Sequence, residues 1–269
     1  MTLAAKLERL NALLAGIPSA LVAFSGGVDS TFLLRMAHAV LGDRCVALTT
    51  VSPTAPVEDI AAAKRFAATL GVPHLLVDTD ELEIAGYAEN PTNRCYFCKD
   101  NLFTICAAEA AQRGMAVVLD GANVDDLGDH RPGLLAAAER GVRHPLVEAG
   151  LTKADIREAS RALGLATWDR PASPCLSSRF PYGTRITAER LARVAAAERF
   201  LRARGFRELR VRFHDPVARL EVPVADMPRL LDPALREEVL RELRALGFGY
   251  VALDLQGFRS GSLNEPLRL

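Results

Sequence analysis

The chain has 269 residues, with 33 Lys or Arg against 33 Asp or Glu, so its formal net charge is zero. No apolar stretch is long enough to cross a bilayer, and segment 1–9 mixes charged and apolar residues unlike a signal peptide. Zero net charge also argues against general affinity for nucleic acid. We therefore expect a cytoplasmic protein that binds neither membrane nor nucleic acid, folded as one large domain or as a large and a small one.

Short apolar runs alternate with helical patterns through the first part of the chain, after an amphipathic helix expected at 2–15. Strands are expected at 20–24, 45–50, 74–77 and 116–119, and helices at 30–41, 57–70, 99–113 and 152–163. Buried strands alternating with helices indicate a parallel sheet covered on both faces. Ligands of such sheets bind beyond the carboxyl ends of the strands.

The pattern changes near Ile186. The elements expected after it are a helix at 187–204, strands at 208–213 and 217–222 joined by a turn at 214–216, a helix at 234–246 and a strand at 250–255. Together they form a small α+β unit. We therefore expect two domains, residues 1–186 and 187–269.

The segment Ser-Gly-Gly-Val-Asp-Ser at 25–30 follows the first buried strand and opens a helix. The two glycines let the backbone approach a phosphate, and the helix start and the serine hydroxyls supply donors. Asp29 would repel a bare phosphate, so we expect Mg²⁺ between them. The alternative is a tight turn without a ligand. The cofactor-binding candidates here are Ser25, Gly26, Gly27, Asp29 and Ser30.

A second loop, residues 120–126, follows another strand at the same edge of the expected sheet. Its candidates are Gly121 and Asn123, although a simple turn would have the same composition. Two further cofactor-binding candidates are Thr50, at the end of the second strand, and Lys99, next to a cysteine.

Five cysteines, an odd and unevenly spaced number, make a poor disulfide framework. Cys45 lies in an apolar strand and Cys106 in an Ala-rich helix, so both are expected in the core. Cys95 and Cys98 form a C-x-x-C pair, and Cys175 lies in a later loop. Such thiols ligate metal, form a redox pair or simply pack. A structural zinc site needs four ligands, whereas three cysteines suit an iron–sulfur cluster with one iron open.

Charged residues of the C-terminal part fall at unusual positions. Glu198 lies in the apolar stripe of its helix, so it should be buried and paired or should face a site. Arg210 and Arg212 alternate with apolar residues on one strand, and Arg219 and Glu221 share a face of the next. Three arginines and a glutamate on one sheet face suit a phosphate or carboxylate ligand. The alternative is an exposed charged face.

The loop at 25–30 resembles the PP-loop of ATP pyrophosphatases. That resemblance implies cleavage of ATP between the α- and β-phosphates and transfer of AMP to a carbonyl or carboxylate oxygen. Segments spread over nearly the whole chain resemble the pattern of the LarE family of sulfur transferases. They are residues 94–99, 120–126, 175–183, 210–212, 218–222 and 254–262.

The LarE resemblance implies an α/β fold: a PP-loop (adenine nucleotide alpha-hydrolase-like) parallel sheet with helices on both faces, plus a small C-terminal α+β domain that binds substrate or supports oligomerisation. It implies an ATP-dependent enzyme that adenylates the carboxylates of pyridinium-3,5-biscarboxylic acid mononucleotide and converts them to thiocarboxylates for the nickel-pincer cofactor. It also implies Mg²⁺, sulfide or another sulfur donor, and a homo-oligomer, a hexamer in relatives.

Two sulfur routes occur in that family. Some members have only the cysteine matching Cys175 and give up its sulfur, which leaves dehydroalanine. Others have three cysteines and bind a 4Fe-4S cluster that passes on an extra sulfide. Because Cys95, Cys98 and Cys175 are all present, this chain resembles the three-cysteine kind.

The resemblance makes Cys175 and Asp29 the catalytic candidates. The substrate and phosphate candidates are Ser178, Arg179, Glu198, Arg210, Arg212 and Glu221. Arg179, four residues after Cys175, would favour the thiolate, unless it is a solvated loop residue. Three other functions stay open. One is a tRNA thiolase, although the chain lacks the excess of basic residues that RNA binding favours. The others are an amide-forming synthetase, in which the cysteines would have no role, and a non-catalytic nucleotide-binding module.

Overall fold

The computed structural model describes residues 1–128, 132–171, 173–259 and 261–268. The chain packs as two compact units: residues 1–81 with 93–170, and residues 82–92 with 171–269. Residues 171–186, which a boundary at 186 assigns to the first domain, therefore pack with the C-terminal unit. Cys95 and Cys98 lie in the first unit and Cys175 in the second.

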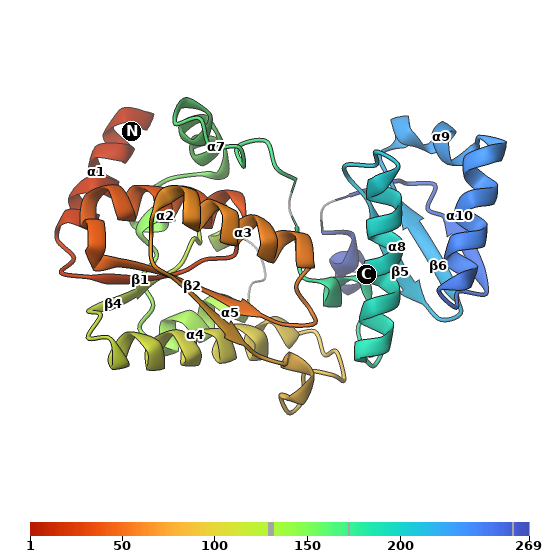
Figure 1. Ribbon diagram of the computed structural model, residues 1–269, viewed down its shortest axis with the longest axis horizontal. Helices are drawn as coiled ribbons and strands as arrows, with labels where there is room; N and C mark the ends of the chain where they lie inside the picture. The colour runs from red at the N-terminus through yellow and green to blue at the C-terminus, as the bar shows by residue number, and fades with distance from the viewer. Residues whose placement is uncertain (129–131, 172, 260, 269) are drawn as a thin grey trace. The chain divides into compact units, whose positions relative to one another are not determined.

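The first unit is built on a four-stranded parallel sheet, as expected from the alternation of strands and helices (Figure 1). Its strands are β1 (Ala20–Ala23), β2 (Cys45–Val51), β3 (His74–Asp78) and β4 (Val117–Leu119), in the order β3-β2-β1-β4. One face is covered by α1 (Leu3–Ala15), α2 (Val28–Leu41), α3 (Val57–Leu70) and α7 (Lys153–Ala162), and the other by α4 (Arg94–Gln112) and α5 (Pro132–Glu139). The short α6 (Pro145–Glu148) precedes α7.

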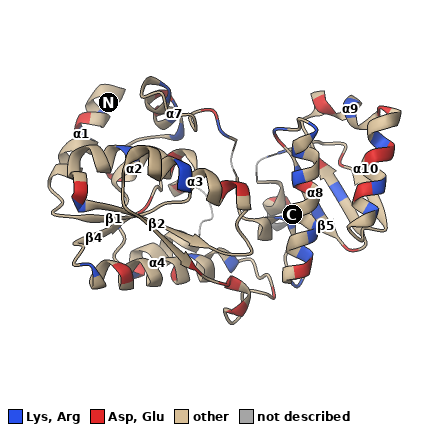
Figure 2. Cartoon of the chain, in the orientation of Figure 1, with Lys and Arg blue, Asp and Glu red and all other residues tan. Residues whose placement is uncertain are grey.

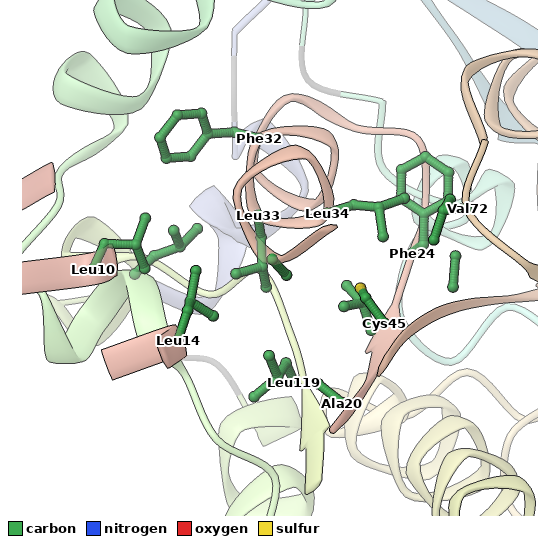
Figure 3. Close-up of a cluster of buried hydrophobic side chains, with 14 of the residues drawn as sticks. Leu10, Leu14, Ala20, Phe24, Phe32, Leu33, Leu34, Cys45, Val72 and Leu119 are labelled. Atoms are coloured by element: carbon green, nitrogen blue, oxygen red, sulfur yellow. The ribbon is translucent and has the colours of Figure 1, made fainter. Parts of the chain in front are cut away.

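Strand β1 is buried on both faces, and its residues alternate between two cores. Ala20 and Val22 join the cluster that includes leucines from α1 and α2, and Figure 3 shows Leu10, Leu14 and Leu33 in this cluster. Leu21 and Ala23 pack instead with side chains of α4 and α5. A strand that packs on both faces is apolar throughout, which explains its uninterrupted hydrophobic sequence.

The strand order creates a switch point beside β1. The chain runs outward from β1 through β2 to β3 and then returns to place β4 on the other side of β1. Ligands of open parallel sheets bind at the carboxyl ends of the strands that flank such a point. The loop after β1 is the segment at 25–30, and the loop after β4 is the segment at 120–126.

The second unit contains a three-stranded sheet of β5 (Arg210–His214), β6 (Val217–Glu221) and β7 (Tyr250–Leu253). The expected hairpin of β5 and β6 is confirmed, and β7 adds in parallel to β6. The helices are α8 (Ala188–Ala203), α9 (Met227–Leu231) and α10 (Pro233–Ala245). None of the helices within the described ranges combines the length and hydrophobicity of a bilayer crossing.

Candidate active site

The loop after β1 has the geometry of an anion site. Gly26 has a φ of +71°, and a Cβ on it would lie 3.1 Å from the Cβ of Ala63. Gly27 caps α2 without any side-chain hydrogen bond to the helix start. The hydroxyl oxygens of Ser25 and Ser30 are 3.0 Å apart beside it. A helix start whose N-cap is a glycine, with no side chain to accept from its N–H groups, suits a phosphate group when two hydroxyls lie beside it.

Asp29, the expected magnesium ligand, lies in the first turn of α2. Its Oδ2 accepts from the Nζ of Lys153, the first residue of α7. Its Oδ1 is buried and has no hydrogen-bond partner in the part of the chain that the structure describes. A carboxylate oxygen that is buried without a donor suits coordination of a hard cation, so the site fits Mg²⁺.

Lys153 is a candidate that the sequence analysis missed. Its Nζ pairs with Asp29, and its backbone N–H donates to the Oδ2 of Asp125 at 2.7 Å. It therefore lies between the two loops at the carboxyl edge, where its charge favours phosphate. The sequence shows only that a Thr-Lys pair begins a helix at 152, with a capping box formed by Thr152 and Asp155.

The second loop packs directly against the first. A Cβ on Gly121 would lie 2.9 Å from the backbone nitrogen of Ser30, so only glycine fits there. The Asn123 side chain accepts from the N–H of Asp125 and so faces its own loop. Thr50 is half-buried near the carboxyl end of β2, at the same edge of the sheet.

Asp120, at the end of β4, joins the second loop to α4. Its carboxylate contacts the Nζ of Lys99 at 3.5 Å and the Nδ1 of His144 at 2.6 Å, and it accepts from the N–H of Ala122 at 3.0 Å. Burial alone would raise the pKa of Asp120, but Lys99, His144 and that N–H together lower it from 3.8 to about 2. Asp120 thus stays ionised and fixes Lys99, the residue after Cys98.

We expect Asp120→Asn to be less stable than the unaltered chain by about 2 kcal/mol at pH 7. The folded-state pKa of this acid is depressed, so its stabilisation is present above the unfolded pKa near 3.8 and is lost as the pH falls towards 2. Urea unfolding at several pH values measures the difference between the two chains.

The control for this measurement is Asp43→Asn, because Asp43 is exposed and its replacement should change stability little at any pH. The gap between the unaltered chain and Asp120→Asn should close between about pH 4 and pH 2. A gap that stays constant over that interval contradicts the assigned ion pairing.

Cys95 is the second and Cys98 the fifth residue of α4, which begins at Arg94, five residues before the helix start expected at 99. Cys95 is exposed and Cys98 half-buried. The i,i+3 spacing places both thiols on one side of the helix, near its N-terminal end. Burial raises the pKa of Cys45 and of Cys106 to about 12, which confirms both as core residues.

Cys175 lies in the second unit, just before a short 3₁₀ turn (Leu176–Arg179). This turn is tied down by Arg179, whose side chain is 0% exposed. The Nη1 of Arg179 donates to the carbonyl oxygens of Pro174 at 2.7 Å and Cys175 at 3.1 Å, and to the hydroxyl of Ser178. Arg179 therefore anchors the Cys175 loop, and the alternative of a solvated arginine is wrong.

Glu198 is buried and paired, as its place in the apolar stripe predicted. Its two oxygens accept from the Nε and Nη2 of Arg179 at 2.8 and 2.9 Å, and Oε1 also accepts from the N–H of Val211. Burial alone would raise the pKa of Glu198, but Arg179 reverses the shift and lowers it. Glu198 neutralises the charge of Arg179. The electrostatic effect of Arg179 on the Cys175 thiol is therefore weaker than we expected from the sequence.

Arg212 connects the same loop to the sheet. It donates to both oxygens of Glu221, at 3.0 and 2.9 Å, to the carbonyl of Ser178 at 2.6 Å and to the hydroxyl of Ser262 at 2.7 Å. Arg210 is also buried, and its guanidinium lies over the ring of Phe258. The alternative of an exposed charged face is therefore wrong.

The second unit thus gathers all six substrate candidates around the Cys175 loop. Five guanidinium groups lie in this cluster, those of Arg179, Arg202, Arg210, Arg212 and Arg219, against the carboxylates of Glu198, Glu221 and Asp254. Burial, and the charges of Arg179, Arg212 and Arg202, lower the pKa of Arg210 to about 10. Figure 2 shows basic residues on both α8 and β5 of this unit, and all of them are arginines. A half-buried excess of positive charge suits an anionic ligand.

The three cysteines proposed as cluster ligands divide between the two units. Within the described residues, no three His, Cys, Asp or Glu side chains are gathered as a metal site. The donors nevertheless have the right chemistry, because each of the three is a thiol outside the buried cores.

Comparisons with known proteins agree with this organisation. A family model for NAD synthase matches residues 10–111, the part that holds β1, the phosphate loop and the C-x-x-C turn. The chain is 45% identical over 265 residues to an uncharacterized protein of Synechocystis, covering 98% of this chain and 99% of that protein. It is 29% identical over 242 residues to an uncharacterized protein of Methanocaldococcus jannaschii, covering 89% and 90%.

A third relative has a named activity. The chain is 42% identical over 267 residues to the pyridinium-3,5-bisthiocarboxylic acid mononucleotide synthase of Lactiplantibacillus plantarum, covering 99% of this chain and 96% of the synthase. The match spans both units, so it includes the phosphate loop and the arginine cluster together. The chain belongs to the LarE family of PP-loop enzymes, that of pyridinium-3,5-bisthiocarboxylic acid mononucleotide synthase.

Proposed function

We propose that this protein is an ATP-dependent sulfur transferase that acts on pyridinium-3,5-biscarboxylic acid mononucleotide. It adenylates the carboxylates of that substrate and replaces the activated oxygen with sulfur, for the nickel-pincer cofactor. The observation that supports this best is the match to the synthase over 99% of the chain. That match favours a mononucleotide over a tRNA as the substrate.

The first step is adenylation. A substrate carboxylate oxygen attacks the α-phosphorus of ATP, the bond from that phosphorus to the β-bridging oxygen breaks, and pyrophosphate leaves. In our proposal the loop at 25–30 holds the outer two phosphates through N–H and hydroxyl donors. When ATP binds, the Nζ of Lys153 would leave its ion pair with Asp29 and pair with a phosphate oxygen. Mg²⁺ held by Asp29 would neutralise charge on the departing pyrophosphate.

Adenylation makes the second step feasible, because AMP leaves from the acyl carbon far more readily than oxide does. A sulfur nucleophile then attacks this carbon, the bond to the AMP oxygen breaks, and a thiocarboxylate results. A 4Fe-4S cluster held by Cys95, Cys98 and Cys175 would supply activated sulfide to this reaction. In the sacrificial alternative, the Cys175 thiolate attacks and the Cα proton and the Cβ–S bond are then lost, which leaves dehydroalanine.

We assign the arginine cluster of the second unit to the anionic groups of the substrate. The cluster has five guanidinium groups against three carboxylates, and Arg179 and Arg212 tie it to the Cys175 loop. A phosphate or carboxylate bound there would compensate the excess charge. It would also lie close to Cys175, the residue at which sulfur chemistry is proposed.

Product analysis tests the proposed function. The protein, Mg²⁺, ATP and a sulfide source are incubated with pyridinium-3,5-biscarboxylic acid mononucleotide, and pyrophosphate and thiocarboxylate are measured. Both products should form. A pyridinium mononucleotide without carboxylates is the matched control and should give neither. Pyrophosphate release that depends instead on total tRNA would contradict the proposal and support tRNA thiolation.

The cluster has its own prediction. Protein purified without oxygen should be brown and absorb near ~400 nm, as iron–sulfur clusters do. Cys95→Ala should lose this colour, because it removes one of three ligands. Cys106→Ala is the matched control and should stay brown, since Cys106 is buried in the core. If protein purified without oxygen is colourless and contains no iron, the cluster proposal is contradicted. The sacrificial route through Cys175 is then the one that remains.

The assembly and location of the enzyme complete the proposal. We expect a cytoplasmic homo-oligomer, a hexamer by resemblance to the family, that takes its sulfur from sulfide or another donor. Light scattering in solution measures the assembly, and a monomeric mass would contradict it.

A further inference from the structure

The phosphate loop is held by a residue that does not belong to it. The Nη1 of Arg170 donates to the carbonyl oxygen of Gly26 at 2.9 Å. The Nη2 of the same guanidinium forms an ion pair with Asp59 of α3. Arg170 is the last residue of the first unit, far along the chain from the loop that it contacts.

These contacts fix the loop against α3. Asp59 and Ala63 are one helical turn apart, so they lie on the same side of α3. Gly26 packs on Ala63, and Arg170 spans from Asp59 to the carbonyl of Gly26. The loop is thus held against α3 by van der Waals contact with Ala63 and by the charged hydrogen bond from Arg170.

The hydrogen bond from Arg170 to the Gly26 carbonyl also affects the N–H of Gly27, the donor that would face the phosphate. The carbonyl of Gly26 and the N–H of Gly27 belong to the same peptide group. A cation that donates to the carbonyl withdraws electron density through this group and makes its N–H a stronger donor. Among the described residues, that N–H donates to the hydroxyl of Ser25, at a long 3.4 Å. A phosphate oxygen would be a better acceptor.

Arg170 is itself held in place. Arg157 on α7 donates from its Nη1 to the carbonyl of Trp168 at 2.7 Å and from its Nη2 to the carbonyl of Arg170 at 2.8 Å. The backbone that bears Arg170 is therefore fixed before any ligand binds. Positioning of this kind lowers the entropy lost when a ligand binds.

We propose that Arg170 is a positioning residue for the phosphate loop, which sets affinity for the outer two phosphates of ATP without touching the nucleotide. This inference rests on the proposed function, because it takes the loop to be the ATP site. It adds a residue that neither the motif nor its neighbours in sequence identify. It predicts that Arg170 matters to ATP and pyrophosphate and not to AMP.

The test is calorimetric binding of Mg-ATP, Mg-pyrophosphate and AMP to the full-length protein. Arg170→Ala should weaken binding of ATP and of pyrophosphate about tenfold each and leave that of AMP unchanged. Arg170→Lys should recover part of the loss, since an ammonium group cannot serve both Asp59 and Gly26 with the same geometry. In steady state the KM for ATP should rise more than kcat falls.

Arg161→Ala is the matched control, because that guanidinium packs over Trp168 in the same region without a bond to the loop. Asp59→Asn keeps an uncharged acceptor for Arg170, so it should weaken ATP and pyrophosphate binding less than Arg170→Ala does. It replaces Arg170→Ala in the test if that variant does not fold. Unchanged pyrophosphate affinity, or equal loss for AMP and pyrophosphate, would overturn the inference. If the unaltered protein binds neither ATP nor pyrophosphate, the proposed function fails first.

Discussion

Replacement of Asp29 by alanine should lower the rate of pyrophosphate release about a thousandfold and leave the fold intact. The loss is large because Oδ1 of Asp29, at the phosphate loop where we propose Mg²⁺, is buried and has no hydrogen-bond partner among the described residues. The fold should survive because the ion pair with Lys153 is partly exposed, and such pairs contribute little to stability. Pyrophosphate release in the presence of substrate measures the first effect, and thermal unfolding measures the second.

Two controls make this result specific. Asp43→Asn removes an exposed carboxylate elsewhere in the same unit and should keep full activity. AMP binding to Asp29→Ala should be unchanged, since AMP lacks the outer phosphates that we assign to the loop. Retained pyrophosphate release in Asp29→Ala would contradict the magnesium role.

The sheet was predictable because its central strand β1 and the first part of β2 are buried. The continuous apolar sequence of β1, and the apolar first half of β2, reflect packing against helices on each side, and this signal is local. The short helices α5, α6 and α9 were not predicted, since one or two turns give too little periodicity. The early start of α4 was missed for a related reason: Asn93, at its N-cap, makes no side-chain capping hydrogen bond.

The candidate site was predictable where one short segment holds the relevant atoms. The glycines and serines at 25–30 are such a case, because the loop and the helix start are contiguous. Lys153 and Arg170 were missed, because they reach this loop from 124 and 144 residues away. No local pattern reports an ion pair across that separation.

Glu198 is an intermediate case. Its position in an apolar stripe predicted burial with a partner, since a buried carboxylate without one is costly. The identity of that partner, Arg179, followed only from the fold of the loop between them. The periodicity of a helix thus shows that a charge must be compensated and leaves open which residue compensates it.

The second large effect concerns Cys175. Cys175→Ser should abolish thiocarboxylate formation and leave adenylation intact, because the serine hydroxyl neither provides sulfur nor replaces a thiolate ligand of iron. Pyrophosphate should still be released with the biscarboxylate substrate, and AMP would follow only as the adenylate hydrolyses. Chromatography of the nucleotide products, together with a pyrophosphate assay, measures both steps in one reaction.

Because both sulfur routes require Cys175, the variant alone does not distinguish them, and the mass of the unaltered protein after turnover does. Sacrifice of the side chain removes about 34 Da, the mass of H₂S, from the peptide that contains Cys175. A cluster that passes on sulfide leaves this mass unchanged and permits repeated turnover.

Cys95→Ala also distinguishes the two routes, since it should stop a cluster-dependent reaction and leave a sacrificial one active. Thiocarboxylate formation by Cys175→Ser would contradict both routes, and the arginine-anchored loop would then have no part in sulfur transfer.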